Sequence, residues 1–331
     1  MTSATAVLPT PANRYQVRFS AKLLLPQYWP AWLLVALLAL LAWLPLAVRV
    51  ALARALQPLI RPFCRKPERI ARRNLQLCFP KQTIAEQQQQ IERLRFTFTL
   101  TALSIGTLTF QSRQRLQSRM RLQGLEHLQQ ARKQGRPVVF LLPHMFALEY
   151  AAAALAMTGL PMVGFVKHHR NPVFNWLSCR QRLRFGGHLF HRDGGIRAVI
   201  AALRQGHSLF YLPDQDHGAN HSQFASFFAT QKATLPVLGR IARSSGALVL
   251  PLSCGFCHQT GLLDMQLQAP LQLEQLSKPQ EAHLLNQQLE QLIAAYPSQY
   301  MWFLKILKSR PDGSQLNYRP DPAATTAVQS N

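Results

Sequence analysis

The sequence predicts an α/β protein in which an N-terminal membrane helix precedes a mixed sheet flanked by helices. Three observations predict this fold. A stretch of 26 residues without a charge, 23–48, lies near the N-terminus. From about residue 136, short apolar runs alternate with segments of helical pattern, as strands and covering helices do. The apolar fraction of 48% is too high for a disordered basic chain.

The first part of the chain divides into a polar lead, 1–22, and a transmembrane anchor, 23–50. The anchor is long enough to cross a bilayer, and tryptophans near both of its ends suit the interfaces. Basic residues are denser after it, beginning with Arg49, than before it. We therefore expect a single crossing with the rest of the chain in the cytoplasm. A cleaved signal peptide and a buried core helix are the alternatives, but the stretch is long and begins late for the first.

The remainder of the chain is predicted as a helical membrane-proximal region, 54–135, an α/β core, 136–320, and a small, polar, disordered tail, 321–331. Apolar residues recur at helical spacing in the first of these. In the core, we expect strands at 138–142, 162–166, 208–212, 247–252 and 262–267. We expect helices at 146–158, 172–184, 196–205, 235–245 and 281–296.

The charge balance narrows the classes of partner. Lys and Arg number 37 against 14 Asp and Glu, which gives a net charge of +23. Such a field favours polyanions, which include nucleic acids, anionic lipid headgroups and acidic proteins. Charge alone does not choose among them.

His144 and Glu149 form an H-x4-E pair directly after the apolar run 138–142. A histidine at the end of a buried strand, followed by a carboxylate, is typical of a general base and its orienting partner. The two side chains can meet only if His144 lies in the turn and Glu149 in the first helical turn. Glu149 would then hold the histidine tautomer and stabilise the imidazolium. A capped helix with a polar loop histidine is the alternative.

Two further groups of polar residues are candidates for binding. Asp214 and Asp216 lie in the loop 211–218 after the third predicted strand, at the edge where open α/β sheets bind ligands. They can bind a metal, hold basic side chains, or form an Asx turn. Arg182, Arg184 and Arg192 precede a glycine-rich helix start, which predicts a phosphate site. A solvated basic face is the alternative for each arginine.

The chain has only five cysteines, and an odd number cannot all pair within one chain. This argues against a disulfide scaffold and fits a reducing compartment. Residues 254–258 match the C-x-x-C-H haem attachment pattern. We expect buried thiols in a strand-rich hairpin instead, because haem attachment needs an oxidising compartment. No second ligand pair for zinc is evident, so no metal is predicted.

With these residues in view, the chain resembles the late lipid A acyltransferases, the Gram-negative lauroyl/myristoyl transferases that act on Kdo-lipid IVA. That family belongs to the lysophospholipid acyltransferase superfamily. The matching pieces are 73–75, 78–80, the pair His144 and Glu149, 175–177, 182–184, 211–218, 227–228, 299–302 and 310–311. Several motifs in one order are far more specific than any one of them.

The resemblance implies a glycerolphosphate/lysophospholipid acyltransferase-like fold in a bacterial inner membrane. It implies transfer of a fatty acyl group from acyl carrier protein to a hydroxyl of an anionic glycolipid acceptor, without a cofactor. The residues matching His144 and Glu149 are the family's base and its partner, and those matching Arg182 and Asp214 are also implicated. By the residues alone, Asp214 is more suited to orienting an arginine than to binding a metal.

Two other functions fit part of the pattern. A lysophospholipid or ornithine lipid acceptor keeps the fold and the chemistry. A membrane-anchored nucleic-acid-binding protein uses only the basic face. We expect no nucleic-acid partner, because the basic residues lack aromatic interleaving and no recognition-helix motif occurs.

Overall fold

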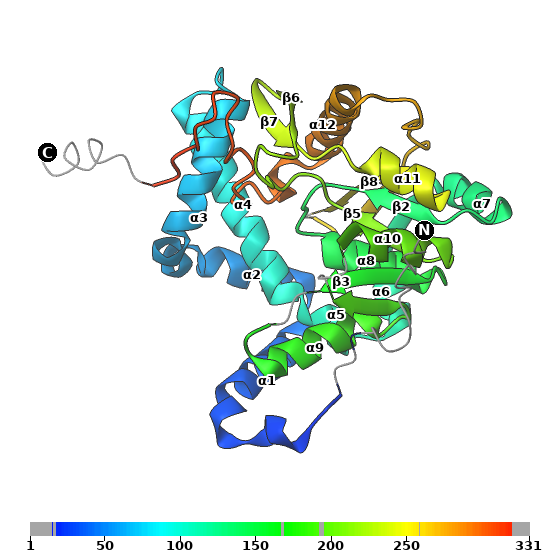
Figure 1. Cartoon of the computed structure of the whole chain (residues 1–331). Coiled ribbons are helices and arrows are strands. Elements are labelled where there is room, and N and C mark those ends of the chain that lie inside the picture. The colour runs from blue at the N-terminus through cyan, green and yellow to red at the C-terminus, as the bar shows by residue number, and fades with distance from the viewer. Residues whose placement is uncertain (1–14, 16–17, 167–168, 192–194, 258, 320–331) are drawn as a thin grey trace, which may run out of the picture.

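The computed structural model describes Tyr15 and residues 18–166, 169–191, 195–257 and 259–319 (Figure 1). Its centre is a seven-stranded sheet in the order β1-β9-β8-β2-β5-β3-β4. Neighbouring strands are parallel except for β8 and β9. The sheet strands are β1 (Met120–Gln123), β2 (Val138–Leu141), β3 (Met162–Val166), β4 (His188–His191), β5 (Ser208–Tyr211), β8 (Leu248–Phe256) and β9 (Leu263–Leu267). The predicted α/β class is confirmed.

Helices cover both faces of this sheet (Figure 1). The N-terminal helices are α1 (Trp29–Trp43), α2 (Leu46–Ala55), α3 (Gln57–Cys78), α4 (Ile84–Ser104), α5 (Gly106–Phe110), α6 (Arg113–Gln117) and α7 (Leu125–Lys133). Those of the core are α8 (Leu148–Met157), α9 (Pro172–Leu183), α10 (Gly195–Arg204), α11 (Leu238–Ser245) and α12 (Lys278–Ala295). Short 3₁₀ turns occur at Ala21–Leu24, Pro26–Tyr28 and Pro297–Gln299.

The central strand β2 shows why the sheet needs two covering layers. Phe140 belongs to the core cluster that includes α8, whereas Val139 and Leu141 belong to the cluster on the opposite face with α10 and α11. All three side chains are fully buried. A strand buried on both faces is a continuous apolar run, and this is how it was recognised in the sequence.

The apolar N-terminal stretch is not one helix. α1 ends at Trp43, Leu44 is extended, and α2 begins after Pro45. Proline has no backbone N–H and disfavours helical geometry in the residue before it, so the predicted anchor 23–50 is interrupted. The segment long and apolar enough to span a membrane is Pro26–Trp43, at 18 residues.

One face of α1 packs on the protein and the other is exposed. A Cβ on Gly106 of α5 would lie 2.3 Å from the carbonyl oxygen of Leu38, so glycine permits this close helix crossing. Large apolar side chains point outward along the other face of α1 at helical spacing, namely Trp29, Leu33, Leu37, Leu40 and Trp43. An exposed apolar face of this size marks a site of membrane or protein contact.

Four strands, β1, β4, β6 and β7, lie outside the ranges expected from the sequence. β1 lies inside the predicted helical region 54–135 and pairs with β9 at the sheet edge. Four residues of alternating pattern are too few to stand out against the helical periodicity around them. The hairpin of β6 (Gln223–Phe227) and β7 (Thr230–Thr234) forms a separate two-stranded sheet against α12. The polar lead predicted at 1–22 lies largely outside the described residues, and the disordered tail predicted at 321–331 lies wholly outside them.

Candidate active site

His144 and Asp214 meet because β2 and β5 are neighbouring parallel strands in a fixed register. Leu141 pairs with Tyr211, and each polar residue follows three positions later. The carboxyl ends of adjacent parallel strands lie at the same sheet edge, where open α/β sheets bind ligands. His144 lies in the loop before α8, as the sequence predicted.

Asp214 holds His144 through two contacts. One carboxylate oxygen accepts a hydrogen bond from the His144 backbone N–H at 2.9 Å. The other lies 2.6 Å from Nδ1 of the imidazole. A carboxylate accepts only, so Nδ1 carries the proton and Nε2 presents its lone pair. The amide nitrogen of Gln215 lies 3.3 Å from Nε2 and can donate to it, which is consistent with this tautomer.

The carboxylate of Asp214 is charged although it is fully buried. Burial raises its pKa, but hydrogen bonds and charge from His144, with the ammonium of Lys232, outweigh this and hold the pKa below its usual value. Lys232 is equally buried, and burial lowers its pKa to about 8 against the attraction of Asp214 and Asp216. The buried hydroxyl of Tyr300 has a pKa well above its usual value, through burial and then the charge of Asp214.

Glu149 does not contact His144, contrary to the sequence prediction. It lies in the first turn of α8, as expected, but its carboxylate accepts hydrogen bonds from Nε of Arg182 at 3.0 Å and from Nη2 of the same side chain. This ion pair joins α8 to α9. Strand register instead places the carboxylate of Asp214 within hydrogen-bond distance of Nδ1 of His144. Asp214 therefore contacts a histidine, where the sequence favoured an arginine.

The other predicted binding residues are placed differently. Arg184 donates to the carbonyl oxygen of Leu108 at 2.6 Å and to that of Gln111, so its guanidinium ties the end of α9 to α5, although the residue is exposed. Asp216 forms the Asx turn that was the alternative interpretation, accepting from Gly218 N–H at 2.9 Å. It also accepts from Ser309 N–H at 2.6 Å. Arg192 lies outside the described residues.

A mostly apolar cavity adjoins the Glu149–Arg182 pair. Its space, open solvent included, is about 990 Å³, and its apolar lining comes from α8, β3 and β5, including Ala152, Ala156 and Phe210. A cavity that combines an apolar lining with a few charged side chains suits an amphiphilic ligand. No group of three or more His, Cys, Asp or Glu side chains able to hold a metal ion occurs in the part of the chain that the structure describes.

The C-terminal segment fixes the loop of His144 from outside the sheet. The carbonyl oxygen of His144 accepts from Met301 N–H at 2.9 Å, and Phe146 N–H donates to the carbonyl of Gln299 at 2.9 Å. Met145 forms a β-bridge with Tyr300 between these bonds. The segment 299–302 therefore holds the loop of His144 in place.

Sequence reasoning missed Lys232 and Tyr300. No local pattern marks Lys232, which lies in the hairpin of β6 and β7, whereas Tyr300 lies within the matching piece 299–302 but was given no role there. Cys254, the first cysteine of the haem-like pattern, is fully buried in the core, where burial raises its pKa to about 12. Cys254 thus fits the predicted pair of buried thiols, whereas Cys257 is only half-buried. The histidine of that pattern lies outside the described residues.

A family model described as bacterial lipid A biosynthesis acyltransferase matches residues 16–309 of this chain. The chain belongs to that family. It is an acyltransferase of lipid A biosynthesis, and the resemblance found in the sequence is confirmed.

Curated relatives of this acyltransferase match over nearly its whole length. A lipid A biosynthesis acyltransferase of Haemophilus influenzae is 35% identical and covers 91% of this chain and 95% of its own. The lipid A biosynthesis myristoyltransferase of Escherichia coli is 34% identical, and the match covers 93% of this chain and 95% of that protein. The lipid A biosynthesis lauroyltransferase of the same organism is 30% identical, and the match covers 91% of this chain and 98% of that protein. These relatives differ in the acyl group that they are named for.

Among solved structures, the 1-acyl-sn-glycerophosphate acyltransferase PlsC of Thermotoga maritima matches with a TM-score of 0.36 and 12% identity. The match covers 77% of this chain and 99% of that one.

Proposed function

We propose that this acyltransferase moves a fatty acyl group from the thioester of acyl carrier protein to a hydroxyl of a Kdo-lipid IVA type precursor, with His144 as general base. The observation that carries the proposal is the buried Asp214, bonded to both the backbone N–H and Nδ1 of His144. This arrangement leaves Nε2 to accept the proton of an acceptor hydroxyl.

The reaction follows from this geometry. Nε2 of His144 takes the hydroxyl proton as the hydroxyl oxygen attacks the thioester carbon, and Asp214 stabilises the imidazolium. The tetrahedral oxyanion then collapses and the carbon–sulfur bond breaks. The leaving thiolate accepts the proton from the imidazolium of His144, which returns the base to its neutral form. The thioester is an activated donor, so the proposed reaction requires no cofactor.

Arg182 is suited to stabilise negative charge during transfer. Glu149 bonds two of its guanidinium nitrogens and fixes its orientation, so that Nη1 can donate to the oxyanion or to a substrate phosphate. Burial lowers the pKa of Arg182, but its bond to Glu149 and the charge of that carboxylate raise it above the usual value. Glu149 thus acts through Arg182.

The charge of the chain and the cavity beside Glu149 support the two proposed substrates. A net charge of +23 favours association with an acidic carrier protein and a phosphorylated glycolipid. The cavity offers an apolar body for the acyl chain behind the polar Arg182. Retention of nucleic acid by the same basic surface would be independent of His144.

We propose that the outer face of α1 attaches the enzyme to the inner membrane, with the catalytic core on the cytoplasmic side. The positive charge after the apolar stretch supports this side. A single crossing, as predicted from the sequence, places the exposed Gln27 at the opposite surface. A membrane-impermeant maleimide would then label Gln27→Cys from outside intact spheroplasts. Labelling only after lysis would instead indicate an α1 embedded from the cytoplasmic side.

The proposed function is tested by acyl transfer in detergent with acyl carrier protein thioesters. Wild type, His144→Ala and the control His283→Ala, an exposed position on α12, are given Kdo-lipid IVA together with a lysophospholipid and an ornithine lipid. We expect acylation of Kdo-lipid IVA by wild type and control, and a loss of at least about 100-fold in His144→Ala. Transfer only to another lipid would overturn the acceptor. Transfer that survives in His144→Ala would overturn the base.

A further inference from the structure

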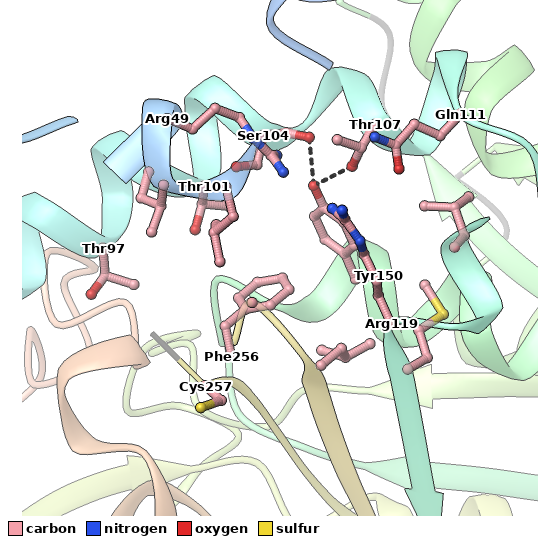
Figure 2. Close-up of a pocket in the computed structure, with 16 residues that line it drawn as sticks. Arg49, Thr97, Thr101, Ser104, Thr107, Gln111, Arg119, Tyr150, Phe256 and Cys257 are labelled. Carbon is pink, nitrogen blue, oxygen red and sulfur yellow. Dashed lines mark hydrogen bonds between the residues drawn. The ribbon is translucent and has the colours of Figure 1, made fainter. Parts of the chain in front are cut away.

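A second pocket, drawn in Figure 2, lies on the other side of α8 from the ion pair of Glu149 and Arg182. Glu149 lines the cavity described above, whereas the next residue, Tyr150, lines this one. Successive helical side chains point about 100° apart, so one helix separates the two. The space of the second pocket, open solvent included, is about 680 Å³, and neither His144 nor Asp214 lines the pocket.

Arg49 of α2 points into this pocket and lacks an anionic partner. Its side chain is only 3% exposed. Within the described part of the chain, Nε of Arg49 has no hydrogen-bond partner, and no carboxylate pairs with the guanidinium. Burial lowers the pKa of Arg49, the neighbouring hydroxyl of Tyr150 opposes this, and two nearby arginines reinforce it. An unpaired buried cation is strongly unfavourable.

A second arginine approaches the same point from the other side of the pocket. Figure 2 shows Arg49 and Arg119 extending toward the hydroxyl of Tyr150. That hydroxyl is itself satisfied, because it donates to the carbonyl oxygen of Ser104 at 2.6 Å and lies 2.9 Å from Oγ1 of Thr107. The described residues that line the pocket include no carboxylate. Two converging cations without an anion form a site for one.

The pocket also presents an unpaired acceptor. Nε2 of Gln111 donates to the carbonyl oxygen of Ala42 at 2.6 Å, which fixes the orientation of the amide. Its Oε1 is buried and has no partner among the described residues. The opposite wall carries the hydroxyls of Thr97, Thr101 and Ser104, which share one face of α4 by their helical spacing. A ligand that fits both ends therefore carries an anion and a hydroxyl.

We propose that this pocket binds a phosphate-bearing lipid headgroup that also carries a hydroxyl, such as a phosphoglycerol. Arg49 and Arg119 would hold the phosphate and Gln111 would accept the hydroxyl proton. The remaining wall is apolar, with Leu46, Leu116 and Met120 available to the first methylenes of a lipid. The site is separate from the catalytic residues and does not rest on the proposed acceptor.

The position of the pocket favours a lipid headgroup over free phosphate. Arg49 follows α1 by six residues in sequence, and α1 carries the exposed apolar face. A residue just beyond a membrane-contacting helix lies at headgroup depth, where anionic lipid is concentrated. Free phosphate has the same charge chemistry, so the experiment must distinguish the two sources.

The test is the thermal stability of the full chain in detergent, with short-chain phosphatidylglycerol, phosphatidylcholine of the same chain length, or inorganic phosphate. We expect phosphatidylglycerol to raise the unfolding temperature of wild type by about 3 °C or more. The shift should vanish in Arg49→Gln and shrink in Arg119→Gln. It should persist in Arg240→Gln, whose arginine is exposed on α11 and does not line the pocket.

A second readout uses the unmodified chain. Cys257 lines the pocket and is half-buried, whereas Cys64 is half-buried elsewhere. Phosphatidylglycerol should slow alkylation of Cys257 by about tenfold relative to phosphatidylcholine and leave Cys64 unchanged. Equal effects of inorganic phosphate would assign the site to free phosphate and support the anion pocket. No shift in wild type, the same shift in Arg49→Gln, or loss of the shift in Arg240→Gln would overturn the proposal.

Discussion

Charges beside His144 are paired within the chain, whereas those in the pocket lined by Tyr150 are not. In the first region, Asp214 contacts His144 and lies near Lys232, and Glu149 holds Arg182. In the second, Arg49 has no anionic partner among the described residues. A buried pair offsets much of its own desolvation, but a buried lone charge does not. The side chains proposed for catalysis are thus held before any substrate binds, whereas the arginines of the second pocket would find an anionic partner only in the proposed ligand.

The strongest test of the paired region is Asp214→Asn. The amide cannot stabilise the imidazolium and does not enforce the Nδ1–H tautomer, so we expect kcat for acyl transfer to fall about 1000-fold with a smaller change in KM. The measurement is steady-state transfer by protein whose circular dichroism matches wild type. Asp312→Asn, at an exposed turn, is the control and should keep wild-type kcat. A kcat within a few fold of wild type would show that Asp214 does not orient the base.

Lys232→Met tests the buried charge of Lys232 through the pH dependence of the free energy of unfolding. Burial lowers the pKa of Lys232 to about 8 in the folded state, against about 10.4 in an unfolded chain. Between these values the unfolded state binds more protons, so the contribution of Lys232 to stability rises with pH. The free energy of unfolding of wild type minus that of Lys232→Met should therefore increase by roughly 3 kcal/mol from pH 7.5 to 10.5.

Denaturant unfolding in detergent at several pH values measures this difference. The exposed Lys278→Met provides the control, and its difference from wild type should stay flat over the same range. A flat difference for Lys232→Met as well would mean that the ammonium of Lys232 titrates as it does in water.

Glu149→Gln distinguishes the two roles considered for this carboxylate. If Glu149 acts by fixing Arg182, its loss lowers kcat/KM by about 10- to 100-fold, and adding Arg182→Gln lowers it little further, since the pair acts as a unit. The measurement is a double-mutant cycle in kcat/KM. Additive losses, with a fall in kcat that equals that of Asp214→Asn, would restore the role predicted from the sequence.

The smallest expected effect is a change in stability on replacing Arg49, in the pocket lined by Tyr150. Arg49→Met removes a buried charge without a partner and replaces it with an apolar side chain of similar length. In lipid-free detergent the variant should be more stable than wild type by about 1 kcal/mol. Denaturant unfolding measures this change. A loss of stability would reveal that Arg49 has a structural role in the ligand-free chain.

The local features of this protein could be predicted from the sequence. β3 has the predicted bounds, and β2 and β5 differ from their predicted ends by one residue, because buried parallel strands are continuous apolar runs. The placement of His144 after β2 and of Glu149 in the first turn of α8 followed from the same reasoning. The exposed face of α1 followed from the length and apolar character of 23–50, although Pro45 interrupts that segment.

The partners of these side chains were decided by the tertiary structure. In the chain β3 follows β2, yet β5 is the strand beside it, so the closeness of Asp214 to His144 depends on strand order that local periodicity does not encode. Arg49 shows the same limit. In the sequence it is the first of a group of basic residues flanking an apolar stretch, whereas the packing of α2 against α4 buries it. Periodicity reports which residues a helix or strand presents together, but the partner of a charge is set by elements distant in sequence.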